Sequence, residues 1–154
     1  MNNLTMFCMS MNSNHLNFIK EINYIPVGLG KDHFSKEWMR DNTGLNITEK
    51  NNHYGEYTFH YWLWKNYLDK INDDWIGFCQ YRKFWSVTKN NLLPDSLEQL
   101  KTLVLNEIPK SHENFEVILG DQRYINQFKL MKFLKKGFKL VLKNPTYLFN
   151  KNKR

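Results

Sequence analysis

The chain has 154 residues, enough for one domain with a substantial core but too few for two ordinary domains. Its 42% hydrophobic and 24% charged residues are typical of a globular protein, and its 16% aromatic residues argue against intrinsic disorder. The net charge of +7 is uneven: residues 123–154 contain ten Lys and Arg and no Asp or Glu, whereas residues 1–122 contain 12 basic and 15 acidic residues.

Neither a secretory signal nor a membrane span is visible in the sequence. Residues 1–9 lack a basic region and an apolar stretch of signal-peptide length, and no run reaches the ~18 apolar residues that a span needs. Cys8 and Cys79 lie in apolar runs without CxxC or metal-ligand spacing, so we expect two reduced, buried thiols. These features predict a cytoplasmic protein.

The first third of the chain predicts two strands followed by a long loop. Residues 5–11 form an apolar run typical of a buried strand, and residues 23–27 predict a second strand that ends at Gly28. Residues 31–53 are polar and predict a loop with one short helical turn near residues 36–40. Loops longer than ~15 residues in a compact domain are usually functional or disordered.

The aromatic segment 54–68 predicts the clearest helix. Large apolar side chains recur on one face at i, i+4, i+7 and i+11: Tyr57, Tyr61, Trp64 and Leu68. Others widen this face until most of the circumference is apolar: Phe59, Trp62 and Leu63. Because such a helix is buried on several sides, we expect core positions for most of Tyr57, Tyr61, Trp62 and Trp64.

Strands and helices continue to alternate in the second half. Residues 75–81 suit an interior strand of a parallel sheet, a helix from Asp95 or Ser96 to about Glu107 follows, and residues 115–119 predict another strand. Residues 124–136 predict a basic amphipathic helix whose seam contains Phe128, Met131 and Leu134 or Lys135, with breaks at Gly137 and Pro145. This alternation predicts an α/β fold.

No complete catalytic motif is readable. The chain has no nucleophile elbow, no phosphate-binding glycine loop and no metal spacing among its five histidines, of which His53 and His60 suit packing roles beside the aromatic helix. Asp73 and Asp74 could hold a divalent cation beside a diphosphate, but a solvated turn is the stronger interpretation because the pair precedes its strand.

Two polar segments are better candidates for ligand binding. Residues 41–51 contain Asp and Asn side chains, which can bond sugar hydroxyls, and Lys50, which can contact a phosphate. Asn and Asp also stabilise turns, which is the alternative interpretation. Residues 81–83 lie at the carboxyl end of a predicted strand, and ligands of open α/β sheets bind at that edge. There Arg82 could clamp a diphosphate, and Tyr81 could stack on a base or sugar.

Four blocks of the sequence match a known pattern in order and spacing. They are Asp41 to Asn51 (DNTGLNITEKN), Tyr54 to Thr58 (YGEYT), Tyr61 to Asn66 (YWLWKN) and Ile76 to Arg82 (IGFCQYR). They resemble the pattern DNTGxNIxxKN, YxExTxxYWxWKN and YIGxxHYRR of a bacterial domain-of-unknown-function family. Its members are regarded as glycosyltransferases of capsular, exopolysaccharide and lipopolysaccharide gene clusters, and residues 117–145 resemble the segment that follows in one branch.

The resemblance implies a Rossmann-like nucleotide-diphospho-sugar transferase domain of the GT-A type, with residues 1–122 as the donor-binding part. Six residues would line the donor site: Asp41, Asn42, Asn46, Lys50, Tyr54 and Tyr81. Arg82 would stabilise the leaving diphosphate, and Glu56 would bind a hydroxyl or act as a base. The implied partners are a nucleotide-diphospho-sugar and a glycan or lipid-linked acceptor, with Mn²⁺ or Mg²⁺ as an optional cofactor that has no assigned ligands.

The chain departs from the pattern at three points. Gln80 stands where many members have His, Leu45 stands where Asp is common, and members are usually longer. We therefore expect a truncated or split reading frame, in which the basic helix and tail of residues 123–154 come from the middle of a longer protein. That segment could contact an anionic membrane, and a transferase implies no nucleic-acid partner. The alternative function is a non-catalytic module or inactive fragment whose basic end contacts membrane or nucleic acid.

Overall fold

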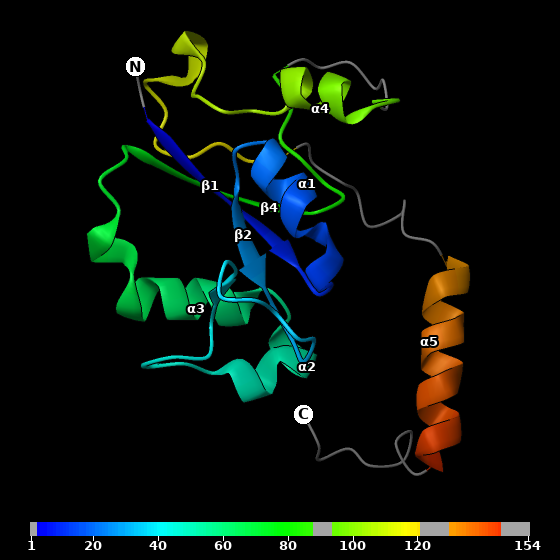
Figure 1. Cartoon of the computed structure of the whole chain (residues 1–154). Coiled ribbons are helices and arrows are strands. Elements are labelled where there is room, and N and C mark those ends of the chain that lie inside the picture. Colours follow the sequence, from blue (N-terminus) through cyan, green and yellow to red (C-terminus); the bar gives the residue numbers. More distant parts are fainter. Residues whose placement is uncertain (1–2, 88–93, 121–129, 146–154) are drawn as a thin grey trace. The chain divides into compact units, whose positions relative to one another are not determined.

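The computed structural model describes residues 3–87, 94–120 and 130–145. The chain divides into two compact units, residues 1–118 and 119–154, and each is described by itself. The first unit is a parallel β-sheet flanked by helices, and the second contains the helix α5 (Leu130–Lys143) (Figure 1).

A four-stranded parallel sheet organises the first unit. Its strand order is β3-β2-β1-β4, with β1 at Leu4–Ser10, β2 at Ile25–Gly28, β3 at Met39–Arg40 and β4 at Trp75–Gln80. Met9 of β1 lies opposite both Val27 of β2 and Gln80 of β4, so β1 is paired along both edges. The α/β prediction is confirmed, and the arrangement is consistent with a Rossmann-like fold.

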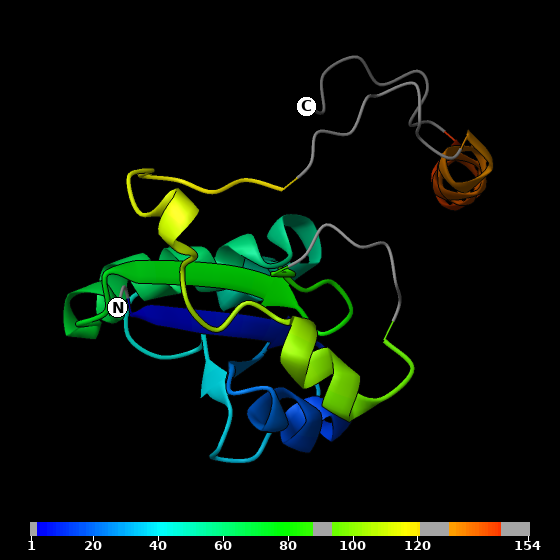
Figure 2. The ribbon, with the colours of Figure 1, turned by 90° about the horizontal axis from the view of Figure 1, so that it is seen from above.

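Helices cover both faces of the sheet because β1 alternates its side chains between two cores. Met6 and Cys8 pack in one core with residues of α1 (Leu16–Glu21) and α4 (Leu97–Leu103). Phe7 and Met9 pack in the other core with residues of α3 (Tyr57–Asn66). Figure 2 shows α1 and α4 on the opposite side of the sheet from α3.

The winding of the chain reverses at β1. The first connection runs from β1 through α1 to β2 on one side, and the chain later returns through α3 to β4 on the other side of β1. The carboxyl ends of β1 and β4 therefore form a topological switch point, where open α/β sheets bind their ligands.

The predicted helix over 54–68 is two helices. Gly55 adopts a φ of 57°, which ends α2 (Asn51–Tyr54) before α3 begins. The buried residues of α3 are Thr58, Phe59, Trp62 and Leu63. The prediction was right for Trp62 but wrong for Tyr57 and Trp64, which are 67% and 60% exposed. A helix that is apolar nearly all round has no single periodic face by which to identify the buried side.

Several other predictions are confirmed with small shifts. The strands expected at residues 5–11 and 23–27 are β1 and β2, and the helix expected after Asp95 or Ser96 is α4. Ser96 is its N-cap, since its Oγ accepts a hydrogen bond from the Gln99 N–H at 3.2 Å. Cys8 and Cys79 are free, buried thiols.

Other predictions are wrong because local pattern does not reveal pairing partners. The turn expected near residues 36–40 is present at its start, since the Trp38 N–H donates to the Ser35 carbonyl at 3.2 Å, but residues 39–40 form β3, which pairs with β2. Among the described strands β4 has only β1 as a neighbour, so it is not an interior strand there. Residues 115–119 are fully described but form no strand, and Phe115, Val117 and Leu119 are exposed. α5 continues through Gly137 to Lys143; residues 124–129, with Phe128, lie outside the described residues.

Buried and exposed aromatic residues of α3 should differ in how much stability is lost when each is replaced by alanine. Phe59→Ala removes a fully buried ring that packs on Phe7 at 5.4 Å between centroids, and should lower the free energy of unfolding by about 3–5 kcal/mol. Trp64→Ala removes an exposed ring and should cost less than about 1 kcal/mol. Urea denaturation would measure both, and equal costs would contradict the orientation of α3.

Candidate functional site

The loops after β1 and β4 meet at the switch point. Ser10 ends β1, and the N–H of Tyr81, directly after β4, donates to the carbonyl of Met9 at 3.1 Å. The ring of His15 stacks on that of Tyr81 with centroids 4.1 Å apart, and its Nδ1 lies 2.8 Å from Ser10 Oγ. Two loops that are about seventy residues apart in sequence are thus held together by stacking and hydrogen bonding.

Glu56 is joined to the same edge by Gln80, the last residue of β4. The Gln80 Nε2 donates to both carboxylate oxygens of Glu56, at 2.7 and 2.8 Å. This amide orients the carboxylate, but unlike the His of the motif pattern it cannot exchange a proton at neutral pH. We call Ser10, His15, Glu56, Gln80, Tyr81 and Arg82 the switch-point cluster.

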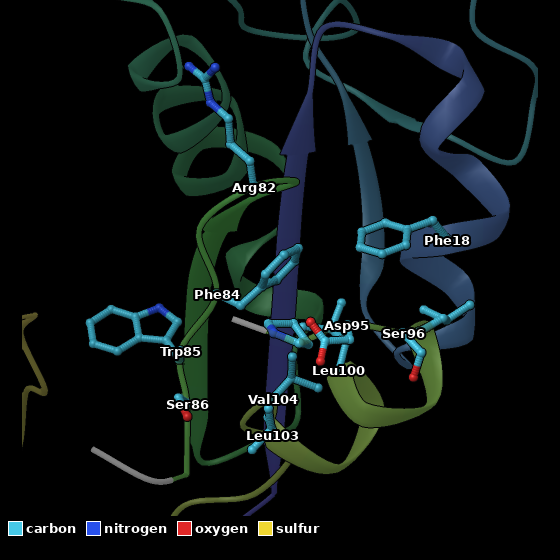
Figure 3. A pocket seen from close by; sticks show the side chains of 12 residues that line it. Phe18, Arg82, Phe84, Trp85, Ser86, Asp95, Ser96, Leu100, Leu103 and Val104 are labelled. Atoms are coloured by element: carbon cyan, nitrogen blue, oxygen red, sulfur yellow. The ribbon is translucent and has the colours of Figure 1, made fainter. Parts of the chain in front are cut away.

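Arg82 supplies the positive charge of the cluster. Its side chain is exposed, and its guanidinium carbon lies 5.7 Å from the Tyr81 ring centroid, within range of a cation–π contact. Figure 3 shows the guanidinium extending towards the carboxyl end of β1, away from Phe84 and Trp85. An exposed guanidinium beside an aromatic ring is suited to an anionic group attached to a planar ligand.

Asp41 follows β3 directly and is completely buried, with 0% of its surface exposed. Its carbonyl accepts a hydrogen bond from the Thr48 hydroxyl, but neither carboxylate oxygen has a partner among the described residues. Buried acceptors without partners are rare and costly, and are the kind of group that a ligand or ion completes. In this conformation Asp41 does not line an open surface.

Two residues of the Tyr61–Asn66 block in α3 hold the polar loop of residues 41–51 by hydrogen bonds. The Trp62 indole N–H donates to the Thr43 carbonyl at 2.8 Å. The Asn66 side chain accepts from the Leu45 N–H at 3.0 Å and donates to the Leu45 carbonyl at 2.8 Å. Asn46 makes local turn bonds, since it donates to the Gly44 carbonyl and accepts from the Thr48 N–H.

Three further predicted binding residues lie on the exposed surface. Asn42 is in the loop, Lys50 ends the 3-10 helix Thr48–Lys50, and Tyr54 ends α2 and is 52% exposed. The contacts of the described residues do not join these three to the switch-point cluster. The structure therefore brings together Glu56, Tyr81 and Arg82 from the predicted set.

Ser10 and His15 were missed by the sequence analysis. A signal for them exists, because Ser10 lies near the end of the first predicted strand, residues 5–11, and the polar run from Asn12 to His15 directly follows that strand. The carboxyl-edge argument that selected Tyr81 and Arg82 applies equally to that run.

An apolar pocket of about 700 Å³ borders Arg82 on the α1 and α4 face of the sheet (Figure 3). Its apolar lining includes Phe18, Phe84, Trp85, Leu97, Leu100, Leu103 and Val104, and its polar lining includes Ser86, Asp95 and Ser96. Phe18 and Phe84 pack edge to face at 5.8 Å, and the Trp85 indole N–H donates to the Phe78 carbonyl at 2.8 Å. This size and composition are typical of a small-molecule site.

The carboxylate pair Asp73 and Asp74 lies at the opposite edge of the sheet. Asp73 accepts a hydrogen bond from the hydroxyl of Thr5, near the start of β1. Trp75, two residues after Asp73, begins β4. Within the described ranges no three His, Cys, Asp or Glu side chains gather as metal ligands. A cation beside the switch-point cluster therefore receives no ligands from this pair.

His60 makes the stability of this region pH-dependent. It is half-buried on α3, its Nε2 has no partner among the described residues, and burial lowers its pKa below 6.5 while Glu56 opposes the shift. As pH falls below 6.5, the unfolded chain binds a proton at His60 before the folded chain does. The free energy of unfolding is therefore highest above pH 6.5 and decreases as the pH approaches the lower pKa of His60 in the folded chain.

We expect the melting temperature to fall from about pH 7.5 to about pH 5.5, and His60→Gln to reduce that fall. The control is His53→Gln, a change at an exposed histidine of α2 that should leave the pH dependence as it is. An unchanged pH dependence in His60→Gln would contradict this assignment.

Gly44 and Asn66 should be energetically coupled. Gly44 has a φ of 56°, and a Cβ there would lie 2.2 Å from Asn66 Oδ1. Gly44→Ala should therefore destabilise the chain by about 1–2 kcal/mol through backbone strain, with an added cost from the displaced Asn66. Removing the Asn66 side chain relieves the clash, so the double variant with Asn66→Ala should cost less than the sum of the two single variants.

Urea denaturation of the four proteins in this cycle would measure the coupling. Gly55→Ala is the control, because Gly55 also has a positive φ but no atom lies within 4 Å of its Cβ position. Its effect should add to that of Asn66→Ala. Additivity at Gly44 would show that Asn66 does not hold the loop.

Comparisons with curated proteins and with solved structures found no match. Residues 8–148 match the family described as a domain of unknown function, DUF4422. That description assigns no activity, so the transferase function and site roles implied by the motif resemblance stay predictions. The match covers most of the sequence, and the chain therefore belongs to the DUF4422 family.

Proposed function

We propose that this chain binds a nucleotide-diphospho-sugar at the switch-point cluster, as the donor-binding part of a glycosyltransferase of cell-surface glycan synthesis. The observation that carries the proposal is the convergence of Tyr81, Arg82 and His15 at the carboxyl ends of β1 and β4. Doubly wound sheets bind nucleotides in this position. The four motif blocks supply the sugar-transfer part of the proposal.

The cluster offers a different kind of contact to each part of such a donor. The Tyr81 and His15 rings suit stacking on a base or sugar, and the Arg82 guanidinium suits a bidentate contact with the diphosphate. Ser10 Oγ and the Glu56 carboxylate can bond hydroxyl groups. Asp41 would take part only after a movement that exposes its buried carboxylate.

In the proposed reaction, an acceptor hydroxyl oxygen forms a bond to the anomeric carbon of the donor sugar. The bond from that carbon to the diphosphate oxygen breaks, and the nucleoside diphosphate leaves with the electron pair. Arg82 stabilises the negative charge on the leaving group, and Glu56 binds the attacking hydroxyl and accepts its proton. The described residues provide no three-ligand set for a divalent cation, and no step here depends on one.

The pocket beside Arg82 is the candidate position for the acceptor. Arg82 belongs to both the pocket lining and the switch-point cluster, so the two candidate sites are neighbours. Its aromatic lining suits the apolar face of a sugar ring or the hydrocarbon of a lipid-linked acceptor. Asp95 and Ser96, before α4, are polar groups that could orient hydroxyls.

Isothermal calorimetry with a panel of nucleoside diphosphates and nucleotide-diphospho-sugars, with and without Mn²⁺, tests the proposal. We expect binding of at least one donor, and Arg82→Ala should weaken it about tenfold or more because a charge-assisted hydrogen bond is lost. The control is Lys110→Ala, which removes an exposed cation in the 3-10 helix Lys110–His112.

The absence of heat with every nucleoside diphosphate would overturn the donor assignment. An equal loss of affinity in Lys110→Ala would overturn the role of Arg82. Salt-sensitive binding to random DNA without nucleotide-sugar binding would instead support a non-catalytic module.

A further inference from the structure

Seven described side chains of α5 form two exposed rows. Four large apolar side chains recur at i, i+3, i+7 and i+11, and each is 50–67% exposed: Met131, Leu134, Phe138 and Leu142. Three exposed lysines recur at i, i+4 and i+8: Lys135, Lys139 and Lys143. Both spacings follow the helical period, so α5 has an apolar stripe beside a cationic one.

The charge of α5 has one sign only. Leu130–Lys143 contains five lysines and no acidic residue, and residues 123–154 contain ten basic residues and no acidic one. No helix among the described residues is long and apolar enough to cross a membrane. An α-helix of 14 residues is only about 21 Å long, against the ~30 Å of a bilayer core.

The combination of both stripes selects one kind of partner. A nucleic acid would use the lysines but would leave the four apolar side chains in water, whereas an uncharged apolar groove would leave the lysines unused. An anionic lipid surface takes both, because the headgroup region attracts lysines and the acyl boundary buries apolar side chains. Amphipathic helices with this composition lie in the plane of such a surface.

We propose that α5 binds the surface of an anionic membrane. Phe138 and the other apolar residues of its row enter the boundary between headgroups and acyl chains, and Lys135, Lys139 and Lys143 face the lipid phosphates. Each lysine near an anionic surface contributes about fivefold to the affinity, and burial of each large apolar side chain contributes about tenfold or more. The inference is independent of the donor site, which lies in the first unit.

Flotation of the full-length chain with lipid vesicles tests the inference. The chain should bind vesicles that contain phosphatidylglycerol and should bind phosphatidylcholine vesicles far more weakly, with affinity decreasing as salt is added. The paired change Leu134→Ser and Phe138→Ser should reduce binding about a hundredfold, because two contributions of about tenfold each are lost. The paired change Lys135→Glu and Lys139→Glu should reduce it at least as much, because each site changes by two charge units.

Matched changes in the first unit are the controls. Phe115→Ser removes an aromatic ring that is 57% exposed, against 67% for Phe138, and Lys110→Glu makes the same charge change outside α5. Neither should alter vesicle binding. Gly137→Ala should strengthen it, because Ala is the better helix former and its Cβ would meet no atom within 4 Å.

Three results would overturn the proposal. The first is a lack of binding to phosphatidylglycerol vesicles. The second is full binding by the Leu134→Ser and Phe138→Ser protein, which would make the interaction purely electrostatic. The third is DNA binding as tight as vesicle binding, with the same dependence on Lys135 and Lys139 but no dependence on the apolar row.

Discussion

The pairing of β1 on both edges and the burial of its two faces are the constraints on which the first unit depends. Phe7 and Cys8 are adjacent in the strand, both are fully buried, and their side chains enter opposite cores. A strand in this position cannot shift by one residue, since every side chain would then change sides of the sheet. The register with β2 and β4 follows from this requirement, and with it the place where the two carboxyl ends meet.

The candidate site is therefore a product of the sheet. The hydrogen bond from its N–H to the Met9 carbonyl holds Tyr81 against the end of β1, and the ring of His15, which also contacts Ser10, stacks on the Tyr81 ring. Gln80, the last residue of β4, donates hydrogen bonds to Glu56, directly before α3, and so fixes the Glu56 carboxylate relative to the strand. Groups from three separate parts of the chain are thus oriented by strand positions that the core determines, which is the rigid support that a binding site needs.

The Tyr61–Asn66 block of α3 has a structural role: it packs in the core and holds the preceding loop. Trp62 packs in the core and also holds Thr43, while Asn66 holds both polar groups of the Leu45 backbone. Many polar groups of the loop therefore stabilise the conformation of the loop itself, and the side chain of Asn46 is one of them. The loop and α3 therefore form one hydrogen-bonded unit.

The sequence by itself determined the α/β class, the positions of β1, β2 and β4 and a helix cap at Asp95 or Ser96, and it selected Arg82 and Tyr81 as candidate binding residues. These depend on local signals: apolar runs of strand length, a hydroxyl before a helix, and polar residues directly after a strand. The tertiary structure alone decided which side of α3 is buried, because Tyr57, Phe59 and Trp64 are all large aromatic residues of one helix, yet only Phe59 is buried. It also decided the short strand β3, the exposed course of residues 115–119 and the meeting of His15 with Tyr81, because each depends on a partner far away in the chain.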